Sequence, residues 1–281
     1  MEEDDQQARC PRRVEDGQLR NCFQAGVHEP AHTDGVPVSF FIWLGIKVLS
    51  YGSEYLIVWM VLDRFKGIGS WSIPEVIVLW AILQLSYTLA APFLFHSAGK
   101  LEQHIVRGSL DYFLVQPIHP LANLIARNFS WTYSSQQLMS AVVLVIALNA
   151  SGFDWSLPKV CFLLLTILGG ISFYAFTFLF GGALNFRMIH GGRSIGGNIR
   201  WLMDLTQYPI GIYPKQLQAF LTFVVPAAMI NYYPAVYLLD KQVELFHPSL
   251  PLISPLVEIA LGQIGIRLFT KGLEWYQSGG G

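Results

Sequence analysis

Charged side chains are scarce in this sequence. Asp, Glu, Lys and Arg make up 13% of its 281 residues, whereas roughly a quarter is usual in a soluble domain. Hydrophobic residues make up 53%, which is the composition of a membrane protein. The net charge of −1 leaves no basic face for nucleic acid, because the few Lys and Arg flank hydrophobic stretches. We therefore expect membrane lipids, and no nucleic acid, as partners.

Cysteines and catalytic motifs are also lacking. Cys10, Cys22 and Cys161 are the only cysteines and do not have metal-ligand spacing, so neither a disulfide framework nor a zinc site is supported. The histidines form no HExxH pair, and no Gly-x-Ser-x-Gly elbow occurs. A glycine-rich turn at 187–197 lacks the Gly-Lys-Ser/Thr ending of a nucleotide-binding loop. We expect no catalytic site, no metal and no cofactor bound by this chain.

Hydrophobic stretches long enough to cross roughly 30 Å of hydrocarbon recur along the chain. They predict an all-α membrane protein whose domain, residues 36–272, has six transmembrane helices, at 40–61, 74–95, 131–150, 159–184, 195–213 and 251–268. Lys and Arg gather on one proposed side, which predicts a multi-pass protein of the plasma or inner membrane with both termini in the cytoplasm.

The two ends of the chain are expected to lie outside this domain. Residues 1–35 are polar and charged, which predicts a disordered cytoplasmic tail. Residues 273–281 form a second tail, and their Ser-Gly-Gly-Gly ending is typical of an added linker.

A polar segment, residues 97–127, interrupts the hydrophobic stretches. Its apolar residues recur at helical spacing, with Lys100, Glu102 and Arg107 between them, as in an amphipathic helix that lies against another surface. Gly108 then bends the chain back towards the membrane. From these residues alone, the segment is either an ordinary connecting loop or a docking helix.

Four motifs of the chain, in order, resemble the type-2 ABC export permeases. Gly108-Ser109-Leu110-Asp111, followed by Leu114 and Pro117, is similar to their cytoplasmic G-x-L-D-x-x-L-x-x-P segment. Further similarity lies at Gly69-Ser70-Trp71-Ser72 with Glu75, at Tyr208-Pro209-Ile210 with Tyr213-Pro214, and at Leu221–Pro226 with Tyr232–Ala235. The resemblance is closest to a branch of six-span permeases whose substrates are mostly unassigned.

This resemblance implies a role for the polar segment. Its residues Lys100, Glu102, Arg107, Gly108 and Asp111 would dock onto a separate ABC ATP-binding subunit, which would bind the ATP and magnesium. Two permease chains, identical or related, would form the exporter together with that subunit.

Charged residues inside the expected spans are candidates for the translocation pathway. A charge in hydrocarbon is costly and is expected to face protein or water. The candidates are Lys47, Glu54, Arg200, Asp204 and Glu258. Arg200 and Asp204 are four residues apart and are expected to pair, either to allow the helix to insert or to contact cargo. Lys47 could instead snorkel to the interface, and a hydrophobic cation is one candidate cargo.

Residues 214–239 are hydrophobic enough to suggest a seventh span. Pro226 and Pro234 would break a continuous helix, and a seventh crossing would place the last basic residues outside. We therefore expect a re-entrant helical hairpin before the final span, capping the outer end of the pathway, and the resemblance implies the same. The outer-gate candidates are Phe223, Pro226, Tyr232, Tyr233 and Pro234, whose aromatic members could equally be packing residues.

Two functions from different classes are compatible with these observations. The favoured one is the permease subunit of an ATP-driven ABC exporter, with energy supplied by a partner ATPase. The alternative is an ATP-independent membrane protein, either a secondary transporter or an integral membrane lipid enzyme. A secondary transporter would more often show internal repeats and intramembrane ion-binding acids. The two halves of this chain show no convincing repeat and few acids, which favours the first function.

Overall fold

The structure, a computed structural model, describes residues 69–187, 203–242 and 246–276, with a few residues between 45 and 60. Lys47 and Glu54 of the expected first span, and Arg200 of the expected fifth, lie outside the described residues. The chain divides into two units, Met1–Ile46 and Lys47–Gly281. The helices that build the fold belong to the second unit, and every element described in it is helical.

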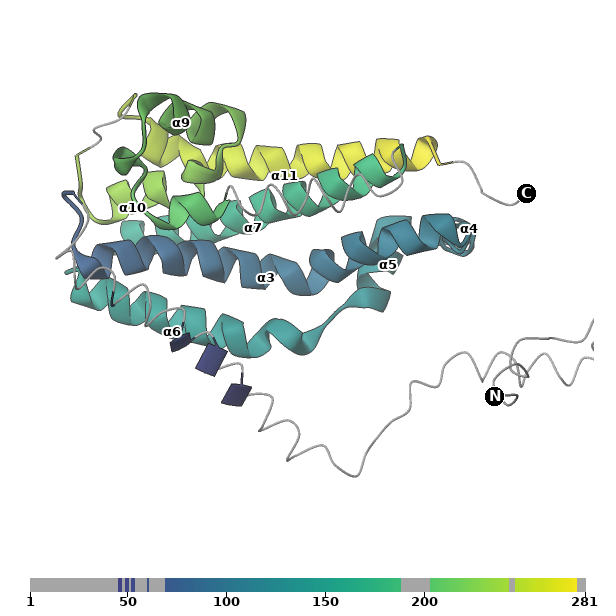
Figure 1. The fold of residues 1–281 in the computed structure, drawn as a ribbon, viewed down its shortest axis with the longest axis horizontal. Helices are drawn as coiled ribbons and strands as arrows, with labels where there is room; N and C mark the ends of the chain where they lie inside the picture. Colours follow the sequence, from purple (N-terminus) through teal and green to yellow (C-terminus); the bar gives the residue numbers. More distant parts are fainter. Residues whose placement is uncertain are drawn as a thin grey trace, which may run out of the picture. The chain divides into compact units, whose positions relative to one another are not determined.

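Four helical segments are long and apolar enough to cross a membrane (Figure 1). They are α3 (Ile73–Val106), η1 with α6 (Trp131–Tyr133 and Ser134–Ala150), α7 (Leu157–Asn185) and α11 (Leu250–Glu274). A fifth crossing is added if the bent pair Lys215–Val224 and Ala227–Leu238 is counted as one span. The all-α membrane fold predicted from the sequence is confirmed to this extent, and the number of six spans stays a prediction.

Short elements gather at the two ends of these long helices. Figure 1 shows α4 at one end and α9 and α10 at the other, so we call these the tip end and the hairpin end. The tip end has α4 (Leu110–Leu114) and α5 (Pro120–Asn128). The hairpin end has η2 (Leu205–Gln207), η3 (Ile210–Ile212), α9 (Lys215–Ala219), the π-helical turn η4 (Phe220–Val224), η5 (Ala227–Met229) and α10 (Tyr232–Leu238).

Helix α7 packs between α3 and α11, and glycines allow all three to approach closely. A Cβ atom on Gly170 would lie 2.4 Å from Ser86 Oγ, and one on Gly182 would lie 3.3 Å from Leu101 Cδ2. In these two contacts, the residue with the higher number on α7 meets the residue with the higher number on α3. The two helices therefore run in the same direction.

Helices α7 and α11 also approach closely at glycines, along a line of contact that we call the seam. A Cβ atom on Gly262 would lie 2.8 Å from Ser172 Cβ, and one on Gly265 would lie 2.7 Å from Phe176 Cα. Here too the residue numbers of the contacting pairs increase along both helices, so α11 runs in the same direction as α7. The chain between the two helices must therefore return from the tip end to the hairpin end.

Prolines inside two long helices have their freed carbonyl groups satisfied by side chains. Pro92 cannot donate to the carbonyl oxygen of Thr88, and Gln137 Nε2 of α6 donates to that oxygen at 2.7 Å. Pro255 likewise frees the carbonyl oxygen of Pro251, which accepts from Ser254 Oγ at 2.9 Å. Because an unpaired carbonyl group is costly in hydrocarbon, these bonds allow α3 and α11 to remain continuous.

Candidate functional site

The tip end is built on an extension of α3. The sequence predicts a span that ends at residue 95 and a separate amphipathic helix after it. In the structure α3 continues to Val106, because no proline follows Pro92 before Pro117. The helix ends where Gly108 adopts a φ of +66°, a conformation that a residue with a Cβ atom rarely adopts.

Buried apolar contacts hold α4 and α5 against the end of α3. Leu110 and Phe113 of α4 belong to one core cluster with Leu101 of α3 and Phe269 of α11. His104 Nδ1 and Ser109 Oγ share a hydrogen bond of 2.9 Å across the Gly108 turn. The tip is therefore fixed to the helices rather than hanging from them as a loose loop.

The outer surface of the tip is apolar. Five apolar or aromatic side chains are not covered by the rest of the chain; they are Val106 (61% exposed), Tyr112 (51%), Leu114 (43%), Val115 (83%) and Ile118 (54%). We call this set the apolar tip. Exposed apolar groups of this kind mark interaction surfaces. These five side chains are not among the docking residues predicted from the sequence, although apolar residues in an otherwise polar segment are a signal that could have identified them.

The docking residues predicted from the sequence differ in how exposed they are. Lys100 and Arg107 are exposed, and Asp111 is partly exposed. Glu102 is 8% exposed and therefore lies within the fold. Arg127 adds a further positive charge beside the apolar tip, with its guanidinium group 5.3 Å from the ring centre of Tyr112. The tip thus presents an apolar surface with basic side chains around it.

At the hairpin end, the chain bends sharply where the sequence predicts a break. The limbs Lys215–Val224 and Ala227–Leu238 meet at an angle of 80°, and Pro226 stands between them without a backbone donor. Residues of both limbs, including Leu221 and Tyr233, pack in one cluster with Val76 and Leu79 of α3. Both limbs therefore contact the same end of α3.

Asn231 joins the hairpin to the rest of the chain. Its side chain is fully buried, and its Nδ2 donates to the carbonyl oxygens of Leu79 at 3.1 Å and Thr206 at 2.7 Å. Its Oδ1 accepts from the backbone N–H of Tyr232 at 2.8 Å. Nothing in the local sequence marks this residue, because two of its partners are distant along the chain.

The predicted outer-gate residues do not form a single cluster. Tyr232, Tyr233 and Pro234 are buried, and the hydroxyl of Tyr233 lies 3.0 Å from Thr222 Oγ. Phe223 is 59% exposed and its ring packs against Phe246, with centroids 5.1 Å apart. The two tyrosines are therefore in packing positions in this conformation, whereas Phe223 is accessible.

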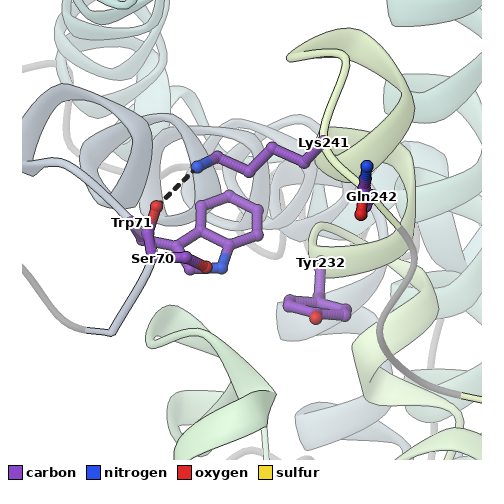
Figure 2. A pocket seen from close by; sticks show the side chains of 5 residues that line it. All are labelled: Ser70, Trp71, Tyr232, Lys241 and Gln242. Atoms are coloured by element: carbon purple, nitrogen blue, oxygen red, sulfur yellow. Dashed lines mark hydrogen bonds between the residues drawn. The ribbon is translucent and has the colours of Figure 1, made fainter.

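A small cavity of about 230 Å³ lies where the hairpin meets the start of α3. Figure 2 shows the side chains that line it, which are Ser70, Trp71, Tyr232, Lys241 and Gln242. Lys241 Nζ donates to the carbonyl oxygen of Ser70 at 2.7 Å, lies 2.9 Å from Glu75 Oε2 and sits 4.8 Å from the ring centre of Trp71. Because Glu75 already pairs with the ammonium group, this arrangement fastens the hairpin to α3.

The intramembrane acids predicted from the sequence lie in different surroundings. Asp204 is exposed at the start of the described part of the fifth segment. This segment continues as the short turns η2 and η3 rather than as a helix to Tyr213, since Pro209 interrupts it. Glu258 is completely buried in the seam. Within the described ranges, no three His, Cys, Asp or Glu side chains come together as metal ligands would.

The long apolar helices define a multi-pass membrane protein. The chain belongs to the ABC-2 family of transporter proteins, whose family model matches residues 48–280. Neither a curated protein nor a solved structure matches it. The resemblance seen in the sequence is thereby confirmed, and the protein is a membrane permease of the ABC transporter class.

Proposed function

We propose that this permease is driven by a separate ABC ATP-binding subunit that docks on the apolar tip. The observation that supports this proposal most directly is the exposure of five apolar side chains on a tip whose other face is packed against the long helices. Lys100 and Arg107 border this patch and would steer a complementary acidic rim on the partner. The sequence has no nucleotide-binding loop, so the ATP and magnesium would be held by the partner.

Helix α3 offers a direct route from this docking surface to the far side of the membrane. Its 34 residues span roughly 50 Å at about 1.5 Å per residue. At the tip end it contacts α4 and α5, and at the hairpin end it accepts a hydrogen bond from Asn231 and pairs with Lys241 through Glu75. A displacement of the tip by the ATPase would therefore reach the hairpin through one rigid helix.

The directions of the long helices support a threading with the hairpin outside and both termini in the cytoplasm. Because α3, α7 and α11 are parallel, the chain must cross once more between α7 and α11. Both limbs of the hairpin pack on one end of α3, which favours a re-entrant hairpin over a span. The remaining crossing would then be the predicted fifth span. The predicted first span, which lies largely outside the described residues, would bring the number to six.

Transport by this permease would require a second permease chain, identical or related, to complete the pathway. Lys47, Glu54, Arg200, Asp204 and Glu258 stay candidates for pathway residues, and Phe223 is the accessible member of the gate candidates. We propose export, with cargo leaving at the hairpin end. Membership of a transporter family disfavours the lipid enzyme, and the apolar tip disfavours a secondary transporter, which needs no docking surface for an ATPase.

Introducing a charge into the apolar tip tests this proposal. Val115→Asp should lower the ATPase activity that copurifies with the full chain from its own membrane by at least about tenfold, since burying a Val side chain contributes roughly 1.5–3 kcal/mol and about 1.4 kcal/mol is tenfold in affinity. Phe246→Asp, an equivalent change at an exposed position of the hairpin end, is the matched control and should retain the activity. Equal recovery with both variants would contradict docking at the tip.

A further inference from the structure

Glu258 is buried in the seam without a polar partner. Its side chain is 0% exposed, and neither carboxyl oxygen has a hydrogen-bond partner in the part of the chain that the structure describes. It faces Gly169 of α7, where an added Cβ atom would lie 2.5 Å from Glu258 Oε2 and 3.0 Å from Pro255 Cα. The carboxyl group therefore occupies the space left by the missing side chain of Gly169.

No positive charge compensates this carboxyl group from the described helices packed against it. The titratable residues of α7 are Lys159, Cys161 and Tyr174, and the other charged residues of α11 are Arg267, Lys271 and Glu274. Arg267 is nine residues from Glu258, about 14 Å along the helix, and Lys159 is ten residues from Gly169, about 15 Å. The neighbouring turn η5 has no titratable side chain, and α10 has only tyrosines.

An ionised carboxylate in such a place would be strongly destabilising. Burial of a charge without a partner costs several kcal/mol, whereas a protonated carboxyl group is far less costly. The two adjacent glycines of α7 bring a second buried polar group to the same level, because Ser86 Oγ of α3 faces Gly170 and also has no partner among the described residues. The centre of the bundle thus holds polar groups that packing alone does not require.

We propose that Glu258 is a proton-binding site that links the packing of α7 and α11 to pH. The closed seam holds the carboxyl group in its acid form. Separation of α7 from α11 exposes the group to water, to which it releases the proton and becomes a carboxylate. A rise in pH therefore favours the open seam, and a fall in pH favours the closed one. This link does not depend on the ATPase, so it stands or fails separately from docking at the tip.

Infrared spectroscopy of the full chain in lipid bilayers tests the proton directly. At neutral pH the wild type should show a carbonyl stretching band of a protonated carboxyl group that is lost in Glu258→Gln. Glu274→Gln, the same substitution at an exposed position of the same helix, is the control and should keep the band. A spectrum that is the same in the wild type and Glu258→Gln would overturn the proposal.

Distances across the seam test the coupling to helix packing. Spin labels at Leu164 of α7 and Leu256 of α11, both 57% exposed, leave the buried contacts in place. The distance between them should widen as the pH is raised in the wild type and stay constant in Glu258→Gln and Glu258→Met, which carry no titratable group there. The same response to pH in the wild type and in either variant would overturn the coupling.

Discussion

Asn231→Leu should detach the hairpin from the rest of the permease. The change leaves the carbonyl oxygen of Thr206 and the N–H of Tyr232 buried without their present partner. Each such group costs roughly 1–3 kcal/mol, so the loss of both should lower the free energy of unfolding by about 2–6 kcal/mol. Denaturant unfolding of the full chain in lipid bicelles measures this loss. Hydrogen exchange should also accelerate over 215–238 more than over α7.

A matched change at another asparagine separates this effect from the general cost of the substitution. Asn149 is exposed at the end of α6 and accepts a hydrogen bond from Trp155 Nε1. Asn149→Leu should change the free energy of unfolding by less than about 0.5–1 kcal/mol, as is usual for surface sites. If the two variants unfold alike, Asn231 does not anchor the hairpin.

Gly108→Val should uncouple ATP hydrolysis from transport while the membrane domain stays folded. Gly108 has a φ of +66°, where a residue with a Cβ atom costs roughly 1–2 kcal/mol and a β-branched residue is a genuine outlier. The turn should therefore relax and move α4 away from its docking position. We expect transport-coupled ATPase activity of the reconstituted complex to fall at least about tenfold.

Gly99→Val is the control for this variant. Gly99 lies in the same extension of α3, is exposed, and would give an added Cβ atom no neighbour within 4 Å. Its φ is not positive, and valine has a slightly higher helix propensity than glycine, so a valine there should not strain the helix. Coupling should survive in Gly99→Val. Similar coupling in both variants would show that the Gly108 turn does not set the docking geometry.

The long helices could be predicted from the sequence because their length and apolar composition are local properties. The span expected at 131–150 corresponds to η1 with α6, and the one expected at 251–268 lies within α11. The break at Pro226 was equally predictable, since proline acts on its own helical turn. The family could also be recognised, because its motifs are short and continuous in the chain.

The contacts that assemble these elements could not be predicted in the same way. Gln137 donates to the carbonyl oxygen that Pro92 frees, yet the two residues lie on different helices. Glu258 stays a candidate for the pathway, but its place beside Gly169 could not be foreseen, because this contact depends on the register of two distant helices. The sequence predicted a separate amphipathic helix after residue 95, and its continuity with α3 was missed, because a change from apolar to charged residues does not by itself mark the end of a helix.

Site-specific photocrosslinking from the apolar tip tests directly whether an ATP-binding subunit docks there. A photoreactive amino acid replaces Val115, and a second chain carries it at Phe246 of the hairpin end as the control. Both are activated in native membranes, and the adducts are identified by mass spectrometry. Docking at the tip predicts an adduct between position 115 and an ATP-binding subunit, with none from position 246. Adducts with lipid alone from position 115, in membranes where the permease transports, would contradict it.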